Sequence, residues 1–138
     1  MATLHKLLRG LGTDFVQFFV GTEEPAQTPV FSAGQMQTVE DVHRKYVFLL
    51  PKREDLRFEM LMETIGPAET DPEWELHDCD VGGLVLSGGP MRLEIEGQGE
   101  WTVKEGDSFY VKANQRHRAM NLGAGALKII TVFDPPRY

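Results

Sequence analysis

The chain has 138 residues, which is the length of one domain and enough to bury a substantial core. Its 41% hydrophobic and 25% charged residues are ordinary for a globular protein, and no apolar run approaches the roughly 20 residues of a membrane-spanning helix. The net charge of −7 argues against nucleic-acid contacts by this chain, because phosphate binding needs clustered Lys and Arg, and it favours a small-molecule or protein partner.

The N-terminal segment, residues 1–21, is predicted to be helical. Thr13 is a suitable N-cap for a second short helix, and the apolar residues of the segment recur at helical spacing: Leu4, Leu7, Leu8 and Leu11, then Phe15, Val16, Phe18 and Phe19. No continuous apolar stretch or small-residue cleavage site follows its basic residues, so no signal peptide is predicted. The single cysteine, Cys79, excludes an internal disulfide and predicts a cytoplasmic protein.

Residues 22–45 are rich in Gly, Pro, Thr and Glu and are predicted to form a linker or arm. From residue 46 to residue 138 the pattern is that of strands. Alternation groups Leu56, Phe58, Met60 and Met62 on one face against Arg57, Glu59 and Glu63 on the other, and it groups Met91, Leu93 and Ile95 against Arg92, Glu94 and Glu96. Gly-rich turns separate these short strands, which predicts an all-β sandwich or barrel.

Two of the four histidines, His77 and His117, fall among the predicted strands, whereas His5 and His43 are expected to be solvated. If residues 74–81 are extended, the two-residue period of a strand places four side chains on one face: Glu75, His77, Cys79 and Val81. A carboxylate, an imidazole and a thiol would then share that face. A lone cysteine among strands is expected to be a small buried side chain.

The stretch GDSFYVKANQRHRAMN, residues 106–121, resembles the second motif of the cupin superfamily. Gly106, His117 and Asn121 match its spacing, whereas Lys112 and Asn114 stand where that family has a proline and a glycine. The resemblance implies a double-stranded β-helix, or jelly-roll, over residues 46–138.

The stretch from Glu75 to Gly88 resembles the first cupin motif, in which two histidines one residue apart precede a glutamate and a glycine. His77 and Gly88 match, Glu75 takes the position of the first histidine, and Val81 takes that of the glutamate. The resemblance implies that Glu75, His77 and His117 line the barrel and hold one divalent ion of Fe, Mn, Zn or Ni. The alternative is a pocket without metal that binds an organic molecule.

The cupin motifs, the ending KIITVFDPPRY and the helical pattern of residues 3–19 together resemble helix-turn-helix transcriptional regulators of the Cro/repressor-like (Xre) type. In those proteins a DNA-binding domain precedes a C-terminal cupin domain. The resemblance implies a small-molecule-sensing, dimerising domain of a regulator, or a shortened relative without the recognition helix, in which ligand binding biases the dimer.

The alternative function is a stand-alone metal-dependent cupin enzyme, such as a dioxygenase, isomerase or lyase acting on a small polar substrate. A third reading is a dimerisation scaffold without a ligand. The predicted ligand-binding residues are Glu75, His77, His117 and, at the pocket mouth, Tyr110. The predicted partners are a small molecule and a second copy of the chain, without a membrane and without nucleic acid bound by this chain alone.

Overall fold

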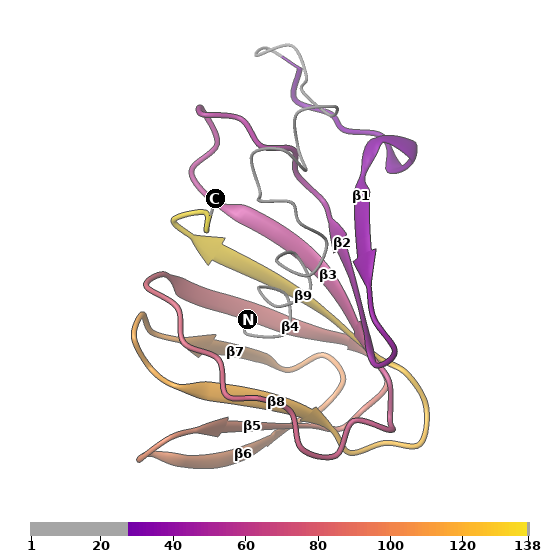
Figure 1. Cartoon of the computed structure of the whole chain (residues 1–138), viewed down its shortest axis with the longest axis vertical. Helices are drawn as coiled ribbons and strands as arrows, with labels where there is room; N and C mark the ends of the chain where they lie inside the picture. The colour runs from indigo at the N-terminus through magenta and orange to yellow at the C-terminus, as the bar shows by residue number, and fades with distance from the viewer. Residues whose placement is uncertain (1–27, 138) are drawn as a thin grey trace.

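The computed structural model describes residues 28–137, which fold as an all-β jelly-roll (Figure 1). One short 3-10 helix, η1 (Ala33–Gln35), precedes the strands in this part of the chain. The strands are β1 (Gln37–Glu40), β2 (Arg44–Phe48), β3 (Glu59–Ile65), β4 (Asp80–Ser87), β5 (Met91–Ile95), β6 (Gly99–Val103), β7 (Ser108–Val111), β8 (His117–Asn121) and β9 (Leu127–Asp134). The helical segment predicted over residues 1–21 lies outside the described residues. Within them, no helix has the length and apolar character needed to cross a bilayer.

The strands form two antiparallel sheets. The large sheet has the order β1-β2-β3-β9-β4-β7, and the small sheet has the order β6-β5-β8. The C-terminal strand β9 lies between β3 and β4, so the end of the chain closes the middle of the large sheet (Figure 1). This placement brings the residues that follow β9 beside the segment that leads into β4.

The sheet begins earlier than the sequence pattern indicates. Residues 37–45, predicted as part of an arm, contain β1 and the first residues of β2, and Glu40 pairs with Lys45 across the turn. Arg44 from this stretch is buried, and its side chain reaches Glu69 and the carbonyl oxygen of Ala119. The polar composition of residues 22–45 hid this strand pair, because an arginine that enters a barrel interior has the same sequence signal as a solvated one.

Strand β3 turns its acidic face inward. Glu59 and Glu63 are buried together with Leu61 and Ile65, whereas Met60 and Met62 are only half-buried and Phe58 is exposed. The alternation was therefore predicted correctly, but the face that carries the methionines is the outer one. In β5 the apolar face, Met91, Leu93 and Ile95, is the buried one as its pattern indicates.

Two arginines of the barrel interior form ion pairs. Arg44 lies 2.7 Å from Glu69, and Arg137 Nε lies 2.7 Å from Glu59 Oε1. Burying an ion pair removes both groups from water, which stabilises the fold little, whereas removing one partner leaves a buried charge that costs roughly 3–5 kcal/mol.

Candidate metal centre

The segment that leads into β4 has the alternation predicted for it. Glu75, His77, Cys79 and Val81 are buried, and the intervening Leu76 and Asp78 are exposed. The extended backbone therefore directs Glu75 and His77 to the same side of the chain.

Glu75 and His117 are joined by an isolated antiparallel bridge. The Glu75 N–H donates to the His117 carbonyl oxygen at 2.7 Å, and the His117 N–H donates to the Glu75 carbonyl oxygen at 3.0 Å. Residues paired in this way have their side chains on the same face, a few ångströms apart. The backbone thus brings the carboxylate and the second imidazole together before any ligand is present.

The backbone of His77 is held by the loop between β7 and β8. The Asn114 N–H donates to the His77 carbonyl oxygen at 2.7 Å. Asn114 has a φ of 65°, in the left-handed region that asparagine tolerates better than other residues with a side chain. Asparagine therefore fills the role for which the family motif has a glycine at this turn.

The three side chains converge. One ligand atom from each of Glu75, His77 and His117 lies within 4.8 Å of the others. The carboxylate oxygens of Glu75 are 4.0 Å from His77 Nε2 and 3.8 Å from His117 Nε2. Ligand atoms bound at about 2.1 Å to one ion lie roughly 3–3.5 Å apart, so a contraction of roughly 1 Å converts the cluster into a coordination shell.

The hydrogen bond of His117 selects its tautomer. His117 Nδ1 lies 2.8 Å from the carbonyl oxygen of Gln115, which can only accept, so Nδ1 carries the proton. In the neutral ring the lone pair is then on Nε2, which lies 3.8 Å from a carboxylate oxygen of Glu75. Metal-binding histidines are commonly oriented by a carbonyl in this way. The donor set is two imidazoles and one carboxylate, which suits Fe(II), Mn(II) or Zn(II) and leaves coordination positions open. The triad can therefore hold a metal ion.

Arg118 fastens the segment before Glu75 to β8. Its guanidinium carbon lies 4.4 Å from the centre of the Trp74 ring, and its nitrogens lie 3.0 Å from Asp71 and 2.8 Å from Glu94. Arg116, by contrast, is half exposed and lies 5.8 Å from the same ring. Both arginines point away from His117, as alternation predicts, and Arg118 forms the closer contacts.

The other predicted site residue, Tyr110, lies apart from the triad. It pairs with Gly82 on the outer face of the large sheet, is 59% exposed, and donates its hydroxyl hydrogen to Asp80. Its neighbour Val111 is the one that points into the core. The structure thus gives Tyr110 no part in the barrel interior. Cys79 is buried as predicted, and burial raises the pKa of its thiol.

The interior also contains polar residues that the sequence reading did not identify as part of a site: Arg44, Tyr46, Glu63 and Thr131. Glu63 is 2% exposed, and its carboxylate accepts a 2.8 Å hydrogen bond from Thr131. Burial, and next the negative charge of Glu75, raises the pKa of Glu63 to about 7. Burial likewise raises the pKa of Tyr46 well above its usual range. A carboxyl with a pKa near neutrality is suited to proton transfer. The sequence did contain a signal for Glu63, because strand alternation places Glu59 and Glu63 on the same face as Leu61.

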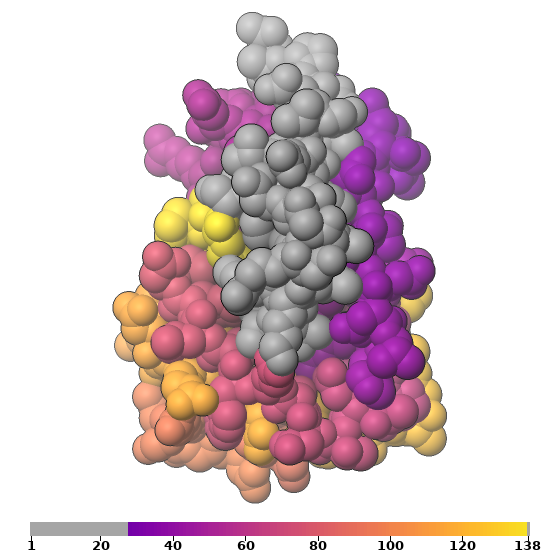
Figure 2. All heavy atoms as spheres, viewed as in Figure 1, coloured from indigo at the N-terminus to yellow at the C-terminus, as the bar shows by residue number. Residues whose placement is uncertain are grey.

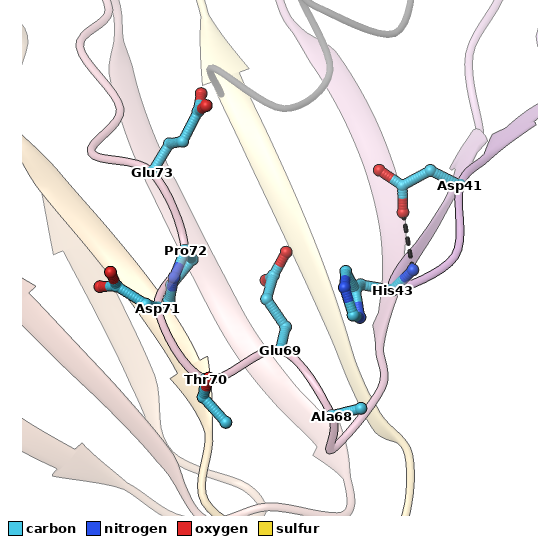
Figure 3. Close-up of a pocket in the computed structure, with 8 residues that line it drawn as sticks. All are labelled: Asp41, His43, Ala68, Glu69, Thr70, Asp71, Pro72 and Glu73. Carbon is cyan, nitrogen blue, oxygen red and sulfur yellow. Dashed lines mark hydrogen bonds between the residues drawn. The ribbon is translucent and has the colours of Figure 1, made fainter.

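Two pockets open near these residues. One, of about 310 Å³, is lined by Leu76, His77, Asp78, Asn114 and Arg137. The other, of about 380 Å³, is bordered by Asp41, His43, Ala68, Glu69, Thr70, Asp71, Pro72 and Glu73 (Figure 3). In the second pocket Asp41 caps the backbone N–H groups of His43 and Arg44, and Glu69 pairs with Arg44. The carboxylates of the second pocket stabilise the local backbone and the Arg44 side chain. The first pocket adjoins the triad, because His77 belongs to both.

Comparison with known proteins agrees with this architecture. The family model described as "Cupin domain" matches residues 61–133, which is more than half of the chain. No curated protein matches the sequence. Among solved structures, the chain is similar to HppE in its Fe(II) form, with a TM-score of 0.69 and 16% identity over 96% of this chain and 75% of that one.

Two smaller proteins give similar superpositions. KdgF from Halomonas sp. has a TM-score of 0.62 and 19% identity, over 78% of this chain and 94% of that one. A putative mannose-6-phosphate isomerase from Ralstonia eutropha has a TM-score of 0.57 and 22% identity, over 80% of this chain and 93% of that one. At these identities the likeness is one of fold.

Proposed function

The chain belongs to the cupin family, and from that premise we propose that it is a metal-dependent enzyme acting on a small polar molecule. The observation that carries the proposal is the convergence of three buried ligand atoms, from Glu75, His77 and His117, within 4.8 Å of one another. This arrangement favours the enzyme over the sensor as the principal function.

In the proposed enzyme, Glu75 and the two histidines hold one divalent ion, which when bound supplies Lewis acidity or activates oxygen. The protein's own contribution is positional. The Glu75–His117 bridge fixes the separation of two ligands, and the Gln115 carbonyl accepts a hydrogen bond from His117 Nδ1, which selects the neutral tautomer with its lone pair on Nε2. The pocket beside His77 provides the volume for a small substrate. Dioxygenase, isomerase and lyase chemistry are the reaction types in view, and one structural neighbour is described in its Fe(II) form and another as a putative isomerase.

The test is the metal content of untagged protein purified without chelator, measured by plasma mass spectrometry. We expect about one equivalent of a divalent metal per chain in the wild type. Glu75→Gln and His117→Ala should each lose most of it, because two remaining ligands hold an ion weakly. His43→Ala is the matched control, since His43 lies outside the triad, and it should keep the wild-type content. Metal far below one equivalent, equal in all four proteins, would overturn the proposal.

The hypothesis of a ligand-sensing domain of a transcriptional regulator is the second candidate function. Its distinguishing feature, the helical pattern of residues 3–19, lies outside the described residues, and none of the three solved structures named above is described as a regulator. A homodimer and the domain boundary at residue 21 also stay predictions. The exposed apolar side chains of Leu84 and Tyr110 on the large sheet support a dimer, and light scattering of the eluting protein would measure it.

A further inference from the structure

Arg137 is a buried arginine with unused hydrogen-bonding capacity. Its side chain is 3% exposed, its Nε lies 2.7 Å from Glu59 Oε1, and its guanidinium carbon lies 3.7 Å from the centre of the Phe133 ring. The other two guanidinium nitrogens are buried and have no hydrogen-bond partner within residues 28–137. Glu59 therefore satisfies only one edge of the group.

A guanidinium carries five N–H donors in a planar fork, and four of them belong to the two unpartnered nitrogens. Leaving a buried donor unsatisfied costs about 1–3 kcal/mol, and more when the group is charged. Buried polar groups in native proteins are for this reason almost always paired. The two nitrogens have the geometry for a planar, two-oxygen acceptor, which is the usual partner of this fork.

Arg137 borders the pocket beside the metal centre, and its two unpartnered nitrogens are buried there. Arg137 and His77 both line the cavity of about 310 Å³, together with the side chain of Asn114. Phe133 lies between the two groups: its ring centre is 5.6 Å from that of His77, edge to face, and it stacks beneath the guanidinium. Figure 2 shows the C-terminal end of the chain, in yellow, next to the rose-coloured segment that leads into β4.

We propose that Arg137 binds the anionic group of the substrate through these two nitrogens, so that the enzyme acts on a small organic acid carrying a carboxylate or a phosphoryl oxyanion. The inference rests on the proposed function for the role of His77, whereas the binding of the anion by Arg137 is a separate interaction that can be tested without metal. A molecule anchored at Arg137 extends along the pocket toward His77 and the open positions of the metal centre. The volume of the pocket lies at the lower end of the range for ligand sites, which selects a small acid.

The surrounding charges allow an anion to bind there. Glu59 balances the charge of Arg137, and a divalent ion at the triad more than balances Glu75. Asp78 also borders the pocket but is exposed, where water and salt screen its repulsion. Arg137 is thus the permanently cationic side chain among the residues that border this cavity.

The test is an NMR titration that follows the Nε–Hε signal of Arg137 and the backbone amides around the pocket. The probes are propionate and methylphosphonate, with propionamide as the neutral analogue of propionate. They are added to zinc-loaded protein and to protein treated with a chelator. The variants are Arg137→Gln, Arg137→Lys, Glu59→Gln and the double variant Glu59→Gln with Arg137→Gln. Arg116→Gln, which removes an exposed arginine outside the pocket, is the control.

We expect at least one of the two anions to bind saturably and propionamide to bind at least tenfold more weakly. Arg137→Gln should weaken the anion at least tenfold, Arg137→Lys should weaken it through loss of the fork, and Arg116→Gln should leave it unchanged. Glu59→Gln should strengthen binding several-fold, because it removes the competing carboxylate. Should Arg137→Gln fold poorly with Glu59 left unpaired, the neutral double variant gives the same comparison in a folded protein.

The proposal is overturned if neither anion binds saturably, if propionamide binds as well as propionate, or if anion affinity is unchanged without Arg137. Its failure differs from failure of the metal centre. In the first case wild type and Arg137→Gln both contain one metal per chain and neither binds the anions. In the second the metal is missing, yet the anions still shift the Arg137 signal in chelator-treated protein. The two anions separate a carboxylate substrate from a phosphorylated one.

Discussion

The hydroxyl of Thr131 on β9 donates a 2.8 Å hydrogen bond to the carboxylate of Glu63 on β3, in the interior of the barrel. The two residues are diagonal neighbours on the inner face of the large sheet, since Glu63 pairs with Ile129 and Thr131 pairs with Leu61. The hydroxyl stabilises the charged carboxylate, but burial and the charge of Glu75 outweigh it and raise the pKa of Glu63 to about 7.

Replacement of Glu63 should change how stability depends on pH in metal-free protein. Its folded pKa of about 7 lies above the ordinary 4.5, so the native state keeps a proton that the unfolded chain releases between these values. The stability from this group is complete below pH 4.5 and is lost as pH rises through 7. Glu63→Gln should therefore be more stable than wild type at pH 8, by up to roughly 3 kcal/mol, and the difference should fall below about 1 kcal/mol at pH 5.

The measurement is the free energy of unfolding in urea at pH 5, 6, 7 and 8, in the presence of a chelator. Glu40→Gln, at an exposed carboxyl on β1, is the control and should run parallel to wild type. A Glu63→Gln curve that also runs parallel to wild type would contradict the assignment.

Cys79 should react slowly with thiol reagents in the folded protein. It is buried, and burial raises the pKa of its thiol, so the reactive thiolate is scarce at neutral pH. Mass spectrometry after iodoacetamide treatment at pH 7.5 should show little labelling under native conditions and complete labelling in denaturant. Rapid native labelling would indicate that the segment leading into β4 opens to solvent far more often than the burial of Cys79 implies.

Gly88 should tolerate a side chain less well than a glycine of the same backbone conformation elsewhere. Gly88 has a φ of +81°, and a Cβ atom there would lie 2.1 Å from the carbonyl oxygen of Ala126. Gly97, in the β5–β6 turn, has a φ of +78° but nothing within 4 Å of such an atom. Both alanine variants bear the strain of the left-handed backbone, about 1 kcal/mol. Only Gly88→Ala must also displace the backbone at Ala126, just before β9.

We therefore expect Gly88→Ala to lower the free energy of unfolding by at least about 2 kcal/mol more than Gly97→Ala, measured by chemical denaturation. Equal losses in the two variants would show that the chain relaxes around Gly88 without cost.

Arg118 should influence metal affinity although it does not touch the proposed ligands. Its contacts with Trp74 and Asp71 hold the segment that ends in Glu75 against β8. Arg118→Gln should weaken zinc binding roughly tenfold, because metal sites commonly lose that much affinity when a residue that holds a ligand in place is removed. Competition with a fluorescent chelator measures the affinity, and Arg116→Gln is the control because Arg116 lies farther from the ring. Equal affinity of the Arg118→Gln variant and wild type would show that the Glu75–His117 bridge suffices to position the ligands.

Much of the fold could be predicted because period-two alternation and glycine turns are local signals. The alternation of residues 75–81 correctly placed Glu75 and His77 on one face, and spacing within the motif added His117. Local signals do not say which face of a strand is the inner one. On β3 the buried face carries Glu59 and Glu63, whose partners, Arg137 and Thr131, belong to the far end of the chain.

Tyr110 was predicted at the pocket mouth but lies on the outer face, again because local signals do not say which face is the inner one. An aromatic residue in a strand near the motif histidine fits either face, and only the pairing of β7 with β4 determines that Val111 points inward and Tyr110 outward. Arg44 was missed because a polar stretch with turn residues resembles an arm until its partner strand is known. In each case the missing information is the register between distant strands.

The Glu75–His117 bridge places the proposed metal site at a joint between the two sheets. Glu75 pairs with β8 of the small sheet, and the chain then runs through His77 into β4 of the large sheet. An ion held by all three residues would act as a cross-link between the layers. Separation of the sheets would have to release it, so the folded state would gain about 1.4 kcal/mol for each tenfold rise in free metal above the dissociation constant. Metal supply would thereby set the thermal tolerance and lifetime of the protein as well as its chemistry.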